Sequence, residues 1–197
     1  MHCEELAEAL AVDARGTFEQ LVAVYQDRLY SFGLHLTGRP WDAEEVAQDT
    51  FVRAYRALER YPAERIRALN LKPWLLQIAL NVFRNRVRGK LLNLVPLDVT
   101  ADGKVDEPAT AIHEWPDEIA ERAEERALLQ KLLLALPERY RVAVVLRHVQ
   151  GLDYGEIASL LGQPVGTAKS NVHRGVRLLR ESMEALPEAA GMAPSGR

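Results

Sequence analysis

The strongest constraint on the fold lies in residues 136–184, where three helical patterns follow one another with a tight turn before the last. Hydrophobic periodicity predicts helices over about residues 138–149, 153–161 and 164–184. Gly162 suits the turn between the last two helices, and Ala158 is small enough to let them cross closely. This arrangement is typical of a helix-turn-helix, whose second helix enters the major groove of DNA.

The last of these helices divides into an apolar side and a polar side. At 100° per residue, the apolar side holds Val165, Ala168, Val172, Val176 and Leu179. The opposite and flanking positions hold Thr167, Lys169, Ser170, Asn171, His173, Arg174 and Arg177. Hydroxyl and amide groups can read base edges, and arginines can bind guanine or phosphate. The pattern therefore predicts a helix that reads duplex DNA, and a helical hairpin that packs on a protein is the alternative.

Charge is unevenly distributed along a chain whose formal net charge is −3. Residues 51–90 carry ten Lys and Arg but two Asp and Glu, whereas residues 1–50 carry ten acidic and three basic side chains. A basic block beside an acidic block favours one local surface for phosphates. A solvated helical face with clustered charges is the alternative explanation.

Composition indicates a globular helical protein. Of the 197 residues, 48% are hydrophobic and 27% charged, and no strand pattern is present. The single cysteine, Cys3, permits no disulfide within the chain and fits a reducing compartment. The acidic start is unlike a signal peptide, and the apolar runs are too short to span a membrane. The sequence thus predicts an all-α, cytoplasmic protein with no membrane span.

The pattern predicts two small helical domains, at residues 17–90 and 117–184. Residues 91–116 contain Pro, Gly and Asp without a period and are predicted to be a flexible acidic linker. Residues 1–16 form an N-terminal extension with a short helix, and residues 185–197 a disordered tail.

The first domain is predicted to hold three helices. One covers about residues 17–36 with Thr17 as N-cap, and the next follows Asp42, which pairs with Glu45 as in a capping box. This second helix ends near residue 59, residues 61–71 form a loop or short turn, and a third helix covers about residues 73–88.

Both later helices of this domain have a polar side. The second places Glu45, Gln48, Asp49 and Arg56 on one side with Arg53 at its edge, which periodicity alone assigns to an ordinary solvated surface. The third places Gln77, Asn81, Arg84 and Arg88 in one stripe beside Trp74. Such a stripe suits single-stranded or partly opened nucleic acid, and an amphipathic helix with a solvated basic face is the alternative.

The literal strings resemble a known family. Residues 136–141, 151–158 and 164–170 resemble region four of bacterial sigma factors, and residues 42–55 resemble their region two. The short two-domain layout resembles the extracytoplasmic-function group. The family commonly has a larger aliphatic residue where Ala168 stands and often an arginine where Asn171 stands. The second departure is expected to change promoter preference.

The resemblance implies three sets of site residues. Contact with the coiled coil of the polymerase β′ subunit is implied for Asp42, Glu45, Gln48, Asp49 and Arg53. Binding of the minus-10 element is implied for Gln77, Asn81, Arg84, Asn85 and Arg88, although relatives commonly have aspartate where Asn85 stands. Binding of the minus-35 element is implied for Thr167, Lys169, Ser170, Asn171, His173, Arg174 and Arg177. The loop at residues 61–71 captures a flipped base in relatives, but its pocket residues cannot be identified from the sequence.

The resemblance therefore implies a transcription initiation factor that binds core RNA polymerase (β′ coiled coil and β subunit) and directs it to promoter DNA. Many relatives are controlled by an anti-sigma factor, which is a further expected partner. No catalytic constellation and no pairs at metal-ligand spacing appear, so no enzyme activity, cofactor or metal is expected. A stand-alone helix-turn-helix regulator and a helical adaptor that binds only protein are the rival interpretations.

Overall fold

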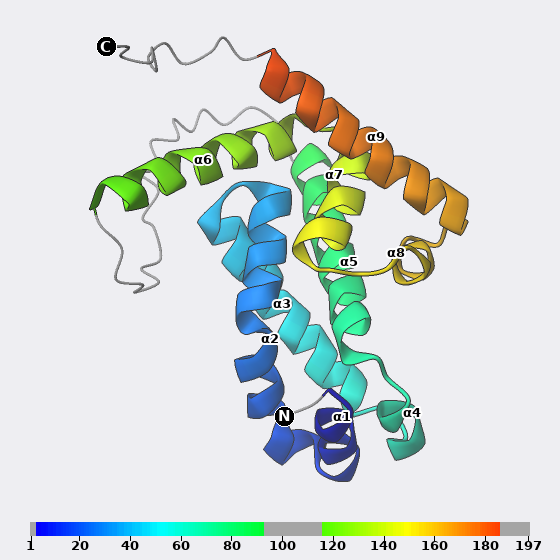
Figure 1. Ribbon diagram of the computed structural model, residues 1–197. Helices are drawn as coiled ribbons and strands as arrows, with labels where there is room; N and C mark the ends of the chain where they lie inside the picture. Colours follow the sequence, from blue (N-terminus) through cyan, green and yellow to red (C-terminus); the bar gives the residue numbers. More distant parts are fainter. Residues whose placement is uncertain (1–2, 93–115, 186–197) are drawn as a thin grey trace, which may run out of the picture.

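The computed structural model describes residues 3–92 and 116–185, and within these two ranges every regular element is a helix (Figure 1). The helices are α1 (Cys3–Val12), α2 (Ala14–Thr37), α3 (Pro40–Leu58), α4 (Ala63–Arg67), α5 (Leu71–Leu92), α6 (Pro116–Ala135), α7 (Glu138–Val144), α8 (Tyr154–Leu161) and α9 (Val165–Glu184), with a π-helical continuation of α7, η1 (Val145–Val149). The predicted all-α class is confirmed. Among the described helices, none is both long and apolar enough to cross a membrane.

The first unit is built on three long helices, α2, α3 and α5, which pack on one another (Figure 1). Helices α2 and α3 cross closely at Gly33, where an added Cβ would lie 3.0 Å from the Cα of Ala43. The core between the three helices includes fully buried side chains such as Leu21, Leu29, Phe32, Val46, Leu75 and Leu80. Gly38, in the left-handed conformation, ends α2 as the sequence indicates.

Two predicted N-caps are wrong. Helix α2 is capped by Asp13, whose side chain accepts a hydrogen bond from the Gly16 amide at 2.9 Å. Thr17 instead lies inside the helix, where its hydroxyl donates to the Ala9 carbonyl at 3.3 Å. Helix α3 begins at Pro40 rather than after Asp42, because proline is already shaped for a first turn and donates no amide there.

The second unit contains the predicted helix-turn-helix, formed by α8 and α9. Asp153 caps α8 in a full capping box with Glu156. Gly162 ends α8 with φ of 62°, and an added Cβ there would meet nothing within 4 Å. The glycine at this turn is therefore required for its left-handed backbone rather than for close packing.

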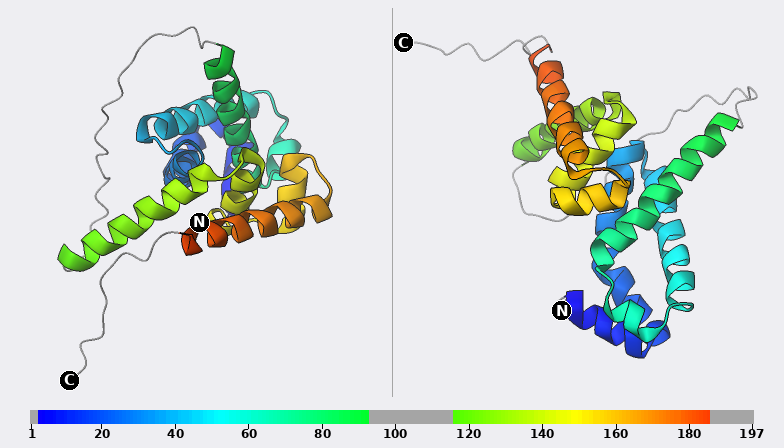
Figure 2. Two further views of the ribbon diagram at one scale, coloured as in Figure 1. Left: turned by 90° about the horizontal axis from the view of Figure 1, so that it is seen from above. Right: turned by 90° about the vertical axis from the view of Figure 1, so that its right-hand side faces the viewer.

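The two units pack against each other, as the views in Figure 2 also show. Gln130 on α6 donates to the Leu34 carbonyl on α2 at 2.9 Å, and Gln150 after η1 donates to the Arg28 carbonyl at 3.4 Å. Buried apolar residues of both units belong to one continuous cluster. The predicted linker and tail lie largely outside the described residues.

Candidate nucleic-acid and protein interfaces

Helix α9 presents most of its predicted reading residues to solvent. Ala168, Val172 and Gly175 are buried against α7 and α8. The side chains of Thr167, Lys169, Ser170, His173, Arg174 and Arg177 are exposed, and that of Asn171 is half-buried. Val165 was predicted on the buried side but is 52% exposed, because it is the first residue of the helix and precedes the packed stretch.

Several of these side chains are held by neighbours within the chain. The Tyr140 hydroxyl of α7 accepts a hydrogen bond from Arg139 at 2.8 Å and lies beside the Arg174 guanidinium. The Arg174 guanidinium, together with Arg139, holds the pKa of that hydroxyl below its usual value. The His173 ring stacks on Tyr154 with centroids 6.4 Å apart. Tyr140, which lies beside Arg174 from another helix, was not predicted as part of this surface.

The stripe on α5 faces the second unit along part of its length. Arg84 Nε lies 3.4 Å from Glu138 Oε1 of α7, so this guanidinium has a carboxylate partner. Gln77 and Trp74 line a groove with α8 residues, including Glu156 and Ser159. Asn81 and Asn85 are exposed, and the side chain of Arg88 lies outside the described residues.

A cluster of cationic and aromatic side chains lies where the 61–71 loop meets α5. The Arg65 guanidinium carbon is 3.7 Å from the centroid of the Tyr61 ring. Tyr61 and Trp74 have ring centroids 6.3 Å apart at 54°. Aromatic and guanidinium planes are the groups on which unstacked bases stack. The sequence analysis did not identify these residues, although aromatic residues on either side of a loop with two arginines are a signal that could have indicated them.

The predicted protein-binding residues of α3 fall into two groups. Glu45 forms an ion pair with Arg86 of α5, and Asp49 lies 3.7 Å from the same guanidinium. Gln48 and Arg53 are exposed, and Asp42 is half-buried. Arg86 therefore positions the Glu45 and Asp49 carboxylates beside the exposed amide of Gln48. Charged groups arranged in this way can orient a protein partner.

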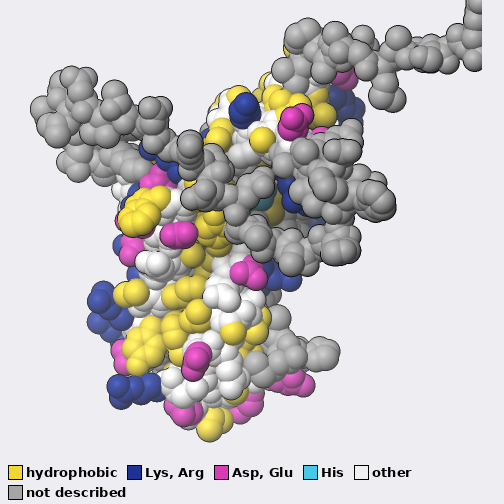
Figure 3. All heavy atoms as spheres, turned by 90° about the vertical axis from the view of Figure 1, so that its left-hand side faces the viewer, with side chains coloured by type: hydrophobic (Ala, Val, Ile, Leu, Met, Phe, Trp, Pro, Cys, Tyr) yellow, Lys and Arg dark blue, Asp and Glu magenta, His cyan; other side chains and the backbone are white. Residues whose placement is uncertain are grey.

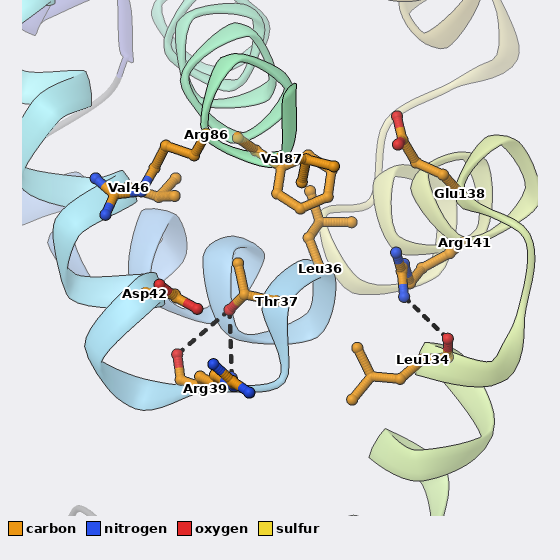
Figure 4. Close-up of a pocket in the computed structure, with 11 residues that line it drawn as sticks. Leu36, Thr37, Arg39, Asp42, Val46, Arg86, Val87, Leu134, Glu138 and Arg141 are labelled. Carbon is orange, nitrogen blue, oxygen red and sulfur yellow. Dashed lines mark hydrogen bonds between the residues drawn. The ribbon is translucent and has the colours of Figure 1, made fainter. Parts of the chain in front are cut away.

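Asp42 lines a cavity of about 390 Å³ between the two units. Figure 4 shows Arg39, Arg86 and Arg141 around it, with Arg141 donating to the Leu134 carbonyl at 3.0 Å. Burial lowers the pKa of Arg141 from its usual value. Asp42 therefore borders this cavity, whereas Gln48 and Arg53 are exposed and do not line it.

An apolar surface adjoins the polar side of α3. Figure 3 shows hydrophobic side chains gathered on one face of the molecule. Two shallow grooves lie between α2 and α3. The lining of one is mainly apolar, with Phe18, Phe51, Val52 and Tyr55, whereas the other sets Val22 and Phe51 among polar side chains. Gln48 lines one of these grooves, so apolar anchors lie next to a predicted contact residue.

The comparisons with known proteins agree with this geometry. Residues 21–91 match the family model for sigma-70 region 2, and residues 126–179 match the one for sigma-70, region 4. The chain is 30% identical over 173 residues to the ECF RNA polymerase sigma factor SigW of Bacillus subtilis, covering 86% of this chain and 90% of SigW. The chain belongs to the extracytoplasmic-function sigma factors.

Further similarities extend to other relatives and to solved structures. This sigma factor is 32% identical over 168 residues to SigE of Mycolicibacterium smegmatis, covering 85% of its own length and 62% of SigE. A solved structure of the sigma factor RpoE in complex with the anti-sigma factor NepR from Bartonella quintana matches with a TM-score of 0.67 and 25% identity. That match covers 86% of this chain and 98% of the other. The family shows that this chain is a promoter-specific transcription initiation factor that acts with RNA polymerase.

Proposed function

We propose that this sigma factor joins core RNA polymerase through α3, binds the minus-10 element through α4 and α5, and binds the minus-35 element through α9. The observation that carries the proposal is the exposed polar side of α9, placed on a capped helix-turn-helix beside the first unit, which has its own arginine-rich surface. In this assignment residues 17–90 and 117–184 are the two working domains.

The minus-35 assignment uses the seven exposed or half-buried α9 residues, with Tyr140 beside Arg174. The polymerase assignment uses Gln48 and Arg53 together with the Glu45 and Asp49 carboxylates that Arg86 positions. Core polymerase then supplies most of the nonspecific DNA affinity, which suits a chain of net charge −3.

The test is transcription in vitro with purified core polymerase on a library of promoter fragments. The proposal expects RNA chains that start at a set of promoters sharing two short elements, and footprints over both elements only when core is present. Core polymerase that neither binds the chain nor initiates with it would contradict the proposal. Footprints of the chain alone would favour the stand-alone regulator.

The cluster of Tyr61, Arg65 and Trp74 supplies the base-stacking part of the minus-10 site in this proposal. Replacing Tyr61 with alanine is expected to lower the affinity of the holoenzyme for a single-stranded minus-10 oligonucleotide about tenfold, since one stacked base contributes about 1–3 kcal/mol. Fluorescence anisotropy with a labelled oligonucleotide measures the change. Tyr61→Phe retains the ring and serves as the control, so an equal loss in both variants would rule out stacking.

Arg84 must leave Glu138 before it can bind a phosphate, because the two side chains form an ion pair in this arrangement. Replacing Glu138 with glutamine is expected to raise the affinity for the same oligonucleotide by about twofold to fivefold, the range of a half-exposed ion pair. The gain should disappear in a background that carries Arg84→Gln. A gain that persists without Arg84 would contradict the role of this pair.

An anti-sigma factor is a further proposed partner. The similarity to RpoE, solved in complex with the anti-sigma factor NepR, supports it, as does the exposed apolar surface between α2 and α3. Purification of the chain from its own cells, followed by identification of a stoichiometric protein that core polymerase displaces, tests this partner. A chain that is fully active and unaccompanied in those cells would contradict it.

A further inference from the structure

Helix α1 lies outside the two matched regions, which begin at residue 21, yet it is firmly joined to the first unit. Leu6, Ala7 and Leu10 are 2%, 2% and 0% exposed and belong to the main apolar cluster. The helix packs on both α2 and α4, and it lies beside α4 at the lower end of the molecule in Figure 1.

The anchorage of α1 to α2 is specific. Asp13 ends the first helix, with its amide bonded to the Ala9 carbonyl at 2.9 Å, and caps the second. The Thr17 hydroxyl also reaches back to the Ala9 carbonyl. These bonds fix the angle between the two helices, so α1 has a defined position on the long helix α2.

Helix α4 depends on such a neighbour. It spans five residues, and a helix of little more than one turn is unstable in water without tertiary packing. Its single buried side chain, Ile66, is 3% exposed and lies in the same apolar cluster as Leu6 and Leu10. Among the described helices, α1 is the one most extensively packed against α4.

The two sides of α4 have different partners. Arg67 Nε donates to both carboxylate oxygens of Glu8 on α1, at 3.1 and 2.9 Å. Arg65 instead lies over Tyr61, which in turn contacts Trp74. Ile66 and Arg67 therefore attach α4 to α1, and Arg65 is left to complete the aromatic cluster on the other side.

We propose that α1 is a positioning element for the minus-10 site: it holds α4 in place so that Tyr61, Arg65 and Trp74 form one preorganised stacking surface for an unstacked base. This inference rests on the proposed function of that cluster. Preorganisation matters because a base that leaves the duplex costs a few kcal/mol, and a surface that must first order itself repays less of that cost.

The test compares Leu10→Ala with Val12→Ala, a substitution on the same helix at a side chain that is 77% exposed. Three quantities are measured on full-length chains: affinity for core polymerase, affinity of the holoenzyme for a single-stranded minus-10 oligonucleotide, and hydrogen exchange along the chain. For Leu10→Ala we expect about tenfold weaker oligonucleotide binding, the loss of one stacked base. Exchange should rise in residues 63–68, and affinity for core polymerase should not change.

The conservative variant Leu10→Met is expected to keep the oligonucleotide affinity of the unmodified chain, and so is Val12→Ala. Unchanged oligonucleotide affinity in a variant whose α4 amides exchange faster would overturn the inference. Parallel losses of core and oligonucleotide binding would also overturn it, because they show a general effect on the fold. Should Leu10→Ala reduce the folded fraction, Leu10→Val replaces it in the same three measurements. Failure of the unmodified holoenzyme to bind the oligonucleotide would instead reject the proposed function.

Discussion

Alanine at both Ser170 and Arg174 is expected to lower binding of the holoenzyme to a duplex minus-35 element about 100-fold. Both side chains are exposed on α9, one turn apart on its polar side. A good contact to a base edge is worth about 1–3 kcal/mol, so the loss of two contacts corresponds to a factor of this order. Arg174 is expected to contribute more than Ser170, because a guanidinium can make a bidentate contact to guanine.

The measurement is an electrophoretic or anisotropy titration with a fixed minus-10 sequence and a set of minus-35 variants. Arg180→Ala is the matched control, because Arg180 is an exposed arginine of the same helix outside the predicted set. Salt dependence separates the two possible roles of Arg174. A phosphate contact reduces the salt slope by about 1 and leaves base preference unchanged, whereas a base contact relaxes preference at one position. Equal losses for Arg180→Ala and the double variant would contradict the assignment to the polar side.

The polar side of α9 could be predicted because it depends on local periodicity. The 100° repeat places Thr167, Ser170 and Arg174 away from Ala168 and Val172, and the structure exposes and buries them accordingly. The same reasoning located the turn at Gly162 and the all-α class. It placed Val165 wrongly, because periodicity does not say where along a helix its packed neighbour begins.

Helix starts were less predictable because several polar residues compete to cap the same end. Asp13 and Thr17 both lie near the start of α2, and Asp13 caps because its carboxylate reaches the Gly16 amide. At α3, Pro40 sets the first turn, so Asp42 falls inside the helix. In both cases the true start lies within about one turn of the predicted one, and composition and spacing do not fix a helix end more closely than that.

Contacts between distant segments were not accessible from the sequence at all. Arg86 meets Glu45 across 41 positions of chain, and Glu138 meets Arg84 across 54. Each pair depends on how two helices are rotated about their axes once they pack. The sequence identified the individual polar residues of the candidate sites, whereas their ion-pair partners follow only from the packing of α3, α5 and α7.

Gly175 on α9 marks a further contact between helices that the sequence does not reveal. Sequence spacing puts it near the apolar side of the helix, yet glycine weakens a helix by about 1 kcal/mol relative to alanine. In the structure it is buried, and an added Cβ would lie 2.5 Å from a Val144 methyl carbon and 3.3 Å from the Tyr140 carbonyl oxygen. Helix α9 therefore crosses α7 at a distance that only glycine permits.

Replacing Gly175 with valine is accordingly expected to destabilise the second unit by about 3 kcal/mol or more, and alanine by about 1–3 kcal/mol. The reference substitution is Gly166→Ala on the same helix, where a Cβ would meet nothing within 4 Å. That change should leave stability equal or raise it by up to about 1 kcal/mol, from the helix preference of alanine. If glycine to alanine lowers the free energy of unfolding at Gly175 but not at Gly166, the close crossing of α7 and α9 is the cause of the loss.

Thermal and urea unfolding followed by circular dichroism, with hydrogen exchange on α7 and α9, measure these differences. Because a domain of this size is stable by only about 5–15 kcal/mol, Gly175→Val removes a large part of that margin. The displaced α9 would also carry Arg174 away from Tyr140, so minus-35 binding should fall more steeply than the unfolded fraction alone accounts for. A Gly175→Val chain that unfolds at the same temperature as the unmodified chain would show that α7 and α9 do not meet at this distance.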